Sequence, residues 1–246
     1  MKKSLALLAV LGCFSQSSMA ATTFTMANLT TAGQTGFHAL AADFGSALSY
    51  KPVTPAAPLG ITGFDIGIEA SATDMSQSAT AWKTLTGTDG LGTMVVPKLY
   101  VAKGLPFDID VAAFYTAIPT TNIAATGFAL SYAIMGGDIA LPAITIRAAV
   151  TNLSGIDEFS FGTKSLDISI SKGFLGITPY IGAGQVWVNS STTNATALAA
   201  GIVGETFTQQ KVFVGLNINL GLPNFAIEGD TTGGTSSYSA KIGLRW

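Results

Sequence analysis

The sequence predicts an all-β protein: an antiparallel, up-and-down transmembrane β-barrel of about ten strands, preceded by a short amphipathic helix. Apolar and polar residues alternate along most of the chain between Gly60 and Trp246, which gives each stretch one apolar and one polar face. Only 11% of the residues are charged and the mean hydropathy is +0.46, whereas a soluble domain has about 25% charged residues. After the N-terminus no apolar run reaches the roughly 18 residues of a spanning helix, which leaves strands as the way to cross a bilayer.

The first twenty residues, 1–20, read as a cleavable export signal. Lys2 and Lys3 give the positive start, residues 5–12 the short apolar core, and Ser18-Met19-Ala20 the cleavage site. Cys13, the only cysteine, lies inside this segment. In the alternative interpretation Cys13 is lipidated at the end of a lipoprotein box. After cleavage the chain would have no disulfide and no thiolate site.

Residues 21–59 form an N-terminal segment ahead of the barrel, which occupies residues 60–246. From Thr35 to Tyr50 the apolar period changes to that of a helix. Prolines then keep the connector to Gly60 extended. We expect this segment to plug the barrel or to cover its periplasmic mouth. The apolar face of the predicted helix consists of Phe37, Leu40, Ala41, Phe44 and Leu48.

Ten alternating segments give the predicted strands. In the sixth, Phe159 and Phe161 are out of phase with Leu166 and Ile168, which predicts a bulge near residues 162–165. Twelve strands are the alternative, if residues 22–29 or 74–92 also form strands. A soluble β-sandwich has the same period but would need more surface charge. The predicted strands are 62–73, 93–103, 107–117, 125–135, 143–151, 159–171, 177–188, 206–220, 224–231 and 236–246.

The connections between these strands are of two kinds. Four are short and marked by Gly or Pro, at 104–106, 138–142, 173–176 and 221–223, as tight hairpins require. Others are longer, and short turns on one rim with longer loops on the other are typical of outer-membrane barrels. The loop segment 195–203, ATALAAGIV, is apolar. It predicts a lid, a contact with lipid headgroups, a collector of apolar solute, or packing against neighbouring loops.

The last strand carries a family resemblance. Its apolar face ends on an aromatic residue, and its other face carries two charged residues, Lys241 and Arg245. This ending resembles the C-terminal strand of Gram-negative outer-membrane proteins, although those usually end in Phe. The resemblance implies a place in the cell outer membrane, surrounded by its lipid, and insertion by the barrel-assembly machinery. The implied insertion signal consists of Tyr238, Ile242, Leu244 and Trp246.

Charged residues collect on the predicted inward faces. Because the last strand must close against the first, Lys241 and Arg245 are expected to face Asp65 and Glu69. Ion pairing in a narrow polar interior is one interpretation, and a solute-binding or ion-selecting site is the other. The predicted lumen charge cluster consists of Asp65, Glu69, Asp108, Asp110, Arg147, Glu228, Asp230, Lys241 and Arg245, and Asp167 shares their face.

Signals for other functions are weak. The phospholipase, lipid A deacylase and omptin families of barrel enzymes use an essential His, but the single histidine, His38, lies on the predicted helix. Without a phosphate loop or His/Cys metal spacing, we expect no enzyme, no metal and no cofactor. A net charge of −2 without a basic stripe argues against nucleic acid as a partner.

Two functions remain after these exclusions. The first is a porin-like channel or carrier that transports small or apolar solutes across the outer membrane. The alternative is a structural or surface-interaction barrel with a filled lumen and no transport.

Overall fold

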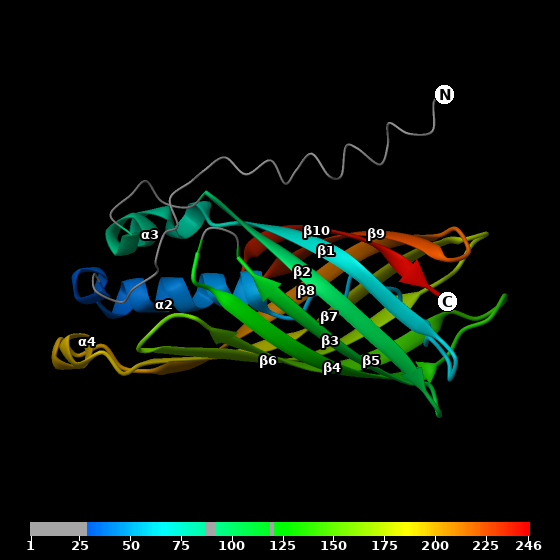
Figure 1. Cartoon of the computed structure of the whole chain (residues 1–246), viewed down its shortest axis with the longest axis horizontal. Coiled ribbons are helices and arrows are strands. Elements are labelled where there is room, and N and C mark those ends of the chain that lie inside the picture. Colours follow the sequence, from blue (N-terminus) through cyan, green and yellow to red (C-terminus); the bar gives the residue numbers. More distant parts are fainter. Residues whose placement is uncertain (1–28, 87–91, 119–120) are drawn as a thin grey trace, which may run out of the picture.

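A computed structural model describes residues 29–86, 92–118 and 121–246, so the predicted signal peptide lies outside the described residues. In this part of the chain ten antiparallel strands form one closed barrel (Figure 1). The seam between β1 and β10 closes it, with a register that runs from Asp65 opposite Arg245 to Thr73 opposite Ser237. The predicted fold class is confirmed. The strands are β1 Phe64–Asp74, β2 Thr93–Leu105, β3 Ile109–Ala117, β4 Ala124–Met135, β5 Ala143–Ser154, β6 Phe159–Ser171, β7 Ile177–Thr192, β8 Glu205–Asn219, β9 Pro223–Thr232 and β10 Thr235–Arg245.

The two faces of each strand differ in exposure as the alternation predicts. On β1, Ile66 and Ile68 are 46% and 50% exposed, whereas the flanking Asp65 and Glu69 are buried. The exposed residues on the outside of the other strands are likewise mostly Val, Leu, Ile, Phe and Tyr. An apolar outer face around a polar interior is the arrangement that a bilayer requires. The fold is therefore that of a small outer-membrane β-barrel.

The two mouths of the barrel are different. The four short turns lie at one mouth, together with Phe64 and the C-terminal Trp246. There the two residues exchange backbone hydrogen bonds of 3.0 and 3.1 Å, and their rings stack at 5.2 Å. We call this end the terminal mouth. The opposite end carries the connections that contain helices, and we call it the loop mouth.

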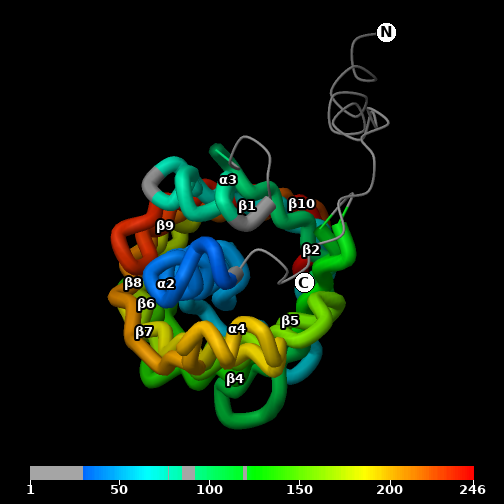
Figure 2. The backbone as a smooth tube through the Cα atoms, turned by 90° about the vertical axis from the view of Figure 1, so that its left-hand side faces the viewer, coloured from blue at the N-terminus to red at the C-terminus, as the bar shows by residue number. Residues whose placement is uncertain are grey.

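The N-terminal segment lies inside the barrel. Helix α2, Leu29–Leu48, is interrupted at Gly33 (φ 64°, ψ −171°) and enters through the loop mouth (Figure 2). From Asp43 onward it is buried on all sides. Residues 49–63 then run through the lumen to the start of β1 at the terminal mouth. Residues 29–63 are called the arm below. Its helix thus lies at the mouth opposite Trp246, and no helix of the described chain is long and apolar enough to cross a membrane.

Two connections at the loop mouth contain short helices, and the described residues form no named strand beyond the ten. Between β1 and β2 lie η2, Ser76–Ser78, and α3, Ala79–Thr86. Between β7 and β8 lies α4, Ala195–Ala199, whose first turn is capped by Asn194. Within the apolar loop 195–203, Ala197 and Ile202 are buried against the arm's apolar cluster. Packing is therefore the observed role of these two residues, whereas the other seven residues of the loop are exposed.

The bulge predicted in the sixth strand is absent. Strand β6 pairs with both neighbours without a register shift, and Phe159 and Phe161 simply point inward. Their apolar side chains fit there because helix α2 fills this level of the lumen. The ring of Phe44 lies 6.0 Å from Phe159 and 5.7 Å from Phe161. The register shift that does occur lies in β4, between Ala133 and Met135.

Candidate functional site: the lumen and the arm inside it

The barrel wall carries ion pairs that point into the lumen. Glu69 on β1 and Lys98 on β2 are direct cross-strand neighbours, and their Oε1 and Nζ atoms are 2.8 Å apart. Arg147 on β5 and Asp167 on β6 form the same kind of pair at 3.1 Å. All four side chains are buried. Because an unpaired charge out of water is costly, each partner offsets the cost of burying the other.

A third group of charges lies at the seam. The Oδ2 atom of Asp65 accepts hydrogen bonds from Lys241 Nζ at 2.7 Å and from Arg245 Nη1 at 3.1 Å. Both cations come from β10, and Lys241 also stands 4.9 Å from the ring centre of Tyr100. The structure thus brings Asp65 together with the two basic residues of the final strand, whereas Glu69 pairs with Lys98.

One cation in the lumen comes from the arm. Lys51 Nζ lies 2.6 Å from Asp230 Oδ1 and 3.2 Å from Ser237 Oγ, and neither charged side chain has any exposed surface. It is the only charged residue of the arm after Asp43. On the described wall the lumen-facing carboxylates outnumber the cations by one, so Lys51 makes the two signs equal. The carboxylates are Asp65, Glu69, Asp110, Asp167, Glu228 and Asp230; the cations are Lys98, Arg147, Lys211, Lys241 and Arg245.

Wall side chains also bind the backbone N–H groups of the arm. Val53 N donates to Glu228 Oε2 at 3.0 Å, Ala56 N to Ser171 Oγ at 3.1 Å, and Leu59 N to Asp110 Oδ1 at 3.1 Å. These three donors are three residues apart, and each follows a proline. The acceptors come from three strands around the barrel, β9, β6 and β3. The arm is therefore held by a regular set of contacts along its length.

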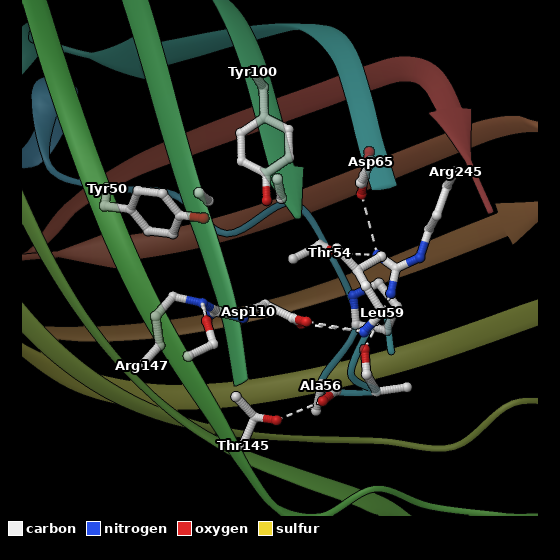
Figure 3. Close-up of a pocket in the computed structure, with 15 residues that line it drawn as sticks. Tyr50, Thr54, Ala56, Leu59, Asp65, Tyr100, Asp110, Thr145, Arg147 and Arg245 are labelled. Atoms are coloured by element: carbon white, nitrogen blue, oxygen red, sulfur yellow. Dashed lines mark hydrogen bonds and ion pairs between the residues drawn. The ribbon is translucent and has the colours of Figure 1, made fainter. Parts of the chain in front are cut away.

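The carbonyl groups of the arm have partners on the wall as well. Lys211 Nζ donates to Tyr50 O at 2.6 Å, and Arg245 Nη2 donates to Ala57 O at 3.1 Å. Thr145 donates to Ala56 O, and Arg245 also donates to the side chain of Thr54 (Figure 3). Two of the five lumen cations of the described wall thus bind the arm's backbone.

At the loop mouth, polar contacts attach helix α2 to both neighbouring loops. Asp43 Oδ2 accepts hydrogen bonds from Trp82 Nε1 and Ser78 Oγ near α3. Burial raises the pKa of Asp43, and these two hydrogen bonds oppose that shift. On the other side, Gln34 accepts from Val203 N at 2.9 Å.

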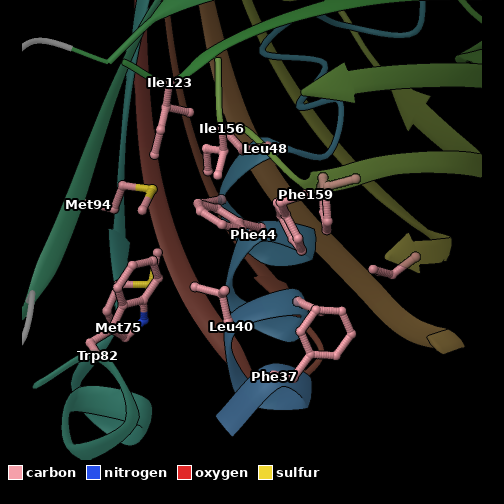
Figure 4. Packing of buried hydrophobic residues seen from close by; sticks show 14 of the residues in the cluster. Phe37, Leu40, Phe44, Leu48, Met75, Trp82, Met94, Ile123, Ile156 and Phe159 are labelled. Carbon is pink, nitrogen blue, oxygen red and sulfur yellow. The ribbon is translucent and has the colours of Figure 1, made fainter. Parts of the chain in front are cut away.

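The apolar part of the arm's contact lies at the same mouth. Phe37, Leu40, Phe44 and Leu48 of α2 pack against the inner wall and against Trp82 of α3 (Figure 4). All of these side chains are buried. The arm is therefore anchored at the loop mouth by both apolar and polar contacts of α2, and from Tyr50 onward by hydrogen bonds to the wall and a smaller apolar cluster.

Little space is left around the arm. A cavity of about 20 Å³ lies between the arm and Arg147, Asp110 and Tyr100. That volume holds about one water molecule. At the terminal mouth a wider vestibule of about 290 Å³ is lined by Arg245, Asn217 and neighbouring turn residues.

The structure places most of the predicted lumen residues inside the barrel, with one exception. Asp108 is exposed in the turn between β2 and β3, where its φ is 56°. The prediction for Asp108 was wrong because β3 begins only at Ile109. Asp110, by contrast, reaches the arm near the terminal mouth. Of the predicted insertion signal, Tyr238, Leu244 and Trp246 are exposed on the outside, and Ile242 is partly exposed there.

Sequence reasoning missed three lumen cations. Lys98 and Lys211 both lie in phase with inward positions, so the alternation itself was a sufficient signal. Lys51 lies in a segment without alternation and gave no such signal.

The single histidine lies outside the lumen wall. His38 Nδ1 pairs with Glu205 Oε2 at the loop mouth, and its ring tilts against Phe207 at 4.6 Å. No three residues of types that bind metal gather anywhere in the described ranges.

No family model matches the sequence, and no curated protein sequence matches it. Among solved structures, the chain is similar to the N-terminal β-barrel domain of Pseudomonas aeruginosa OprF, with 14% identity, a TM-score of 0.38 and coverage of 76% of this chain and 99% of that one. It is also similar to the KdgM porin, at 8% identity, TM-score 0.37 and coverage of 73% and 98%. For the outer membrane protease OmpT of Escherichia coli the identity is 9% and the TM-score is 0.36, with coverage of 75% of this chain and 95% of that one. Similarity at this level assigns neither a subfamily nor an activity.

Proposed function

We propose that this chain is an outer-membrane barrel whose resting lumen is closed by its own arm, and that it acts as a structural or surface-interaction protein. The observation that carries the proposal is the pair of Lys51 and Asp230, which joins arm and wall with no exposed surface on either side chain. An open channel would expose both charges to water. The apolar outer face and the aromatic C-terminus support the outer membrane as its location.

Planar-bilayer recordings of the purified full-length chain test this proposal. We expect no steady conductance, because the arm occupies the lumen and its Lys51 pairs with Asp230 with no exposed surface on either side chain. Protection of the strands from added protease would show that the barrel is inserted. Stepwise conductance from inserted, full-length chain would contradict the closed resting lumen.

A channel or carrier for small or apolar solutes is the second candidate. The vestibule of about 290 Å³ at the terminal mouth favours it, since a solute could collect there beside Arg245. A protease site placed at residues 60–63, where Ile61 is exposed, allows the arm to be cut from the folded barrel and extracted. Liposome swelling after extraction but not before would support a gated channel. Absence of uptake in both forms would exclude transport.

A further inference from the structure

We propose that the lumen is a binding site for an extended polypeptide that carries one cation followed by a proline at every third residue, and that residues 50–59 are its exchangeable resident ligand. This inference rests on the closed lumen of the proposed function. It goes further, because a filled lumen could equally be a permanent core.

The spacing of the contacts is the first argument. Pro52, Pro55 and Pro58 are three residues apart, and the donors that follow them reach acceptors on three different strands of the barrel. Proline has no N–H, so the free donors of the segment belong to the other positions. The backbone N–H group directly after each proline donates a hydrogen bond to the wall. The acceptors are the side chains of Glu228, Ser171 and Asp110. A wall that matches this period recognises a kind of chain rather than one side chain.

Recognition through the backbone is the second argument. Between Tyr50 and Leu59 the wall makes hydrogen bonds to three N–H groups, at residues 53, 56 and 59, and to three carbonyl groups, at residues 50, 56 and 57. Main-chain contacts supply affinity in peptide-binding sites, while a few pockets supply selectivity. The larger apolar cluster of the arm belongs to α2 at the loop mouth. Within residues 50–59, Tyr50 and Leu59 also pack against a smaller apolar cluster of the wall that includes Tyr100 and Phe114.

Charge gives the site its selectivity. With the arm in place, Lys51 balances the one excess carboxylate of the described lumen wall, and its partner Asp230 also accepts a hydrogen bond from Thr232. A peptide without that cation would leave Asp230 buried and unpaired, which is strongly unfavourable. The ligand therefore needs a positive charge at the position before its first proline.

Two features make the resident ligand exchangeable. Val53 is fully buried at φ 41°, a left-handed conformation that a β-branched residue rarely adopts. Such strain persists only where surrounding contacts impose it. The wall also has unused hydrogen-bonding capacity, since Asp65 Oδ1, Asp167 Oδ2 and Glu228 Oε1 are buried and have no partner among the described residues. The arm is therefore not the best possible occupant of this site.

The test uses the folded full-length chain, cut by protease at a site introduced at residues 60–63, after which the arm is extracted; the product is called the cut barrel. A fluorescent peptide of residues 46–60 is then added to cut and uncut barrels. We expect saturable binding to the cut barrel that is at least tenfold tighter than binding to the uncut barrel. A scrambled peptide and a peptide with alanine at residues 52, 55 and 58 are the matched controls, and both should bind at least tenfold more weakly.

A second measurement isolates the charge. A peptide with Lys51→Ala should bind the cut wild-type barrel about tenfold more weakly than the parent peptide, and this preference should disappear in a cut Asp230→Asn barrel. A cut barrel that stays folded but takes up no peptide would overturn the proposal. So would equal binding of the scrambled peptide. Neither outcome affects the conductance of the uncut chain, on which the proposed function depends.

Discussion

Lys51 is the residue on which the closed lumen depends most directly. Its ammonium group has no exposed surface and a single carboxylate partner, Asp230, at 2.6 Å. When one member of a buried pair is removed, the other is left as an uncompensated charge.

Lys51→Met should therefore destabilise the folded barrel by about 3–5 kcal/mol. Urea unfolding in detergent, followed by tryptophan fluorescence, measures the change. The double variant Lys51→Met with Asp230→Asn removes both charges and should recover most of the loss. Equal destabilisation in the single and double variants would show that packing, and not charge, is what Lys51 contributes.

The backbone at Val53 gives a second prediction. Val53→Gly and Val53→Ala both remove the buried side chain, but only glycine adopts φ 41° without a steric penalty. We expect the Gly variant to be more stable than the Ala variant by about 1 kcal/mol. Thermal unfolding of the two proteins checks this difference. An Ala variant as stable as the Gly variant would mean that the position is not strained.

Asp43 gives the attachment of α2 a pH dependence. Burial raises its pKa in the folded protein, so the folded state holds a proton that the unfolded state has already released. Its contribution to stability is therefore present in acid and is lost as the pH rises through the folded pKa. Unfolding measured from acid to neutral pH should show this decline in the wild-type protein. The difference in unfolding free energy between wild type and Asp43→Asn at each pH isolates the contribution of Asp43. Identical pH profiles of the two proteins would contradict this contribution.

At the scale of elements, helix α2 contacts the barrel wall at Gly45, which has no side chain. A Cβ atom on Gly45 would lie 2.7 Å from Val188 Cγ2 on β7, closer than packed carbon atoms allow. Gly45 thus interrupts the helical pattern in the sequence because the helix must lie against a strand.

Gly45→Val should push α2 away from β7 and destabilise the arm by about 1–3 kcal/mol. Ala39→Val, on the half-exposed part of the same helix, is the matched control and should change stability by no more than about 0.5 kcal/mol. Limited proteolysis of the arm at increasing temperature compares them. If both variants release the arm at the same temperature, the close approach of Gly45 to β7 does not contribute to the stability of the arm.

The strands could be predicted because a barrel wall imposes one period on the whole chain. The sixth strand, 159–171, was even predicted with the bounds that are observed. Its false bulge came from Phe159 and Phe161, since inward residues were assumed to be polar. They are apolar because a helix far away in the sequence packs on them, and alternation carries no information about that contact. For the same reason the site was found only in part: the charges of the wall follow the period, whereas Lys51 and the proline-spaced contacts of the arm do not.

At the scale of the whole molecule, the arm relates the two mouths to the two sides of the membrane. Because short turns of outer-membrane barrels lie in the periplasm, we expect the terminal mouth there and α2 at the cell surface. A cysteine at Thr35, exposed on α2, should react with a membrane-impermeant maleimide on intact cells. A cysteine at Ile139, fully exposed in the β4–β5 turn, should react only after permeabilisation. The reverse pattern would invert the orientation.

The seam between β1 and β10 has a consequence for the order of assembly. The arm precedes β1 in the chain and passes through the ring that β1 and β10 complete. Once β1 and β10 have paired, the arm cannot enter or leave sideways through the wall without breaking hydrogen bonds between strands. The arm therefore enters either by lying on the open sheet before the last strand docks or lengthwise through a mouth of the closed barrel, and once threaded it can move only lengthwise.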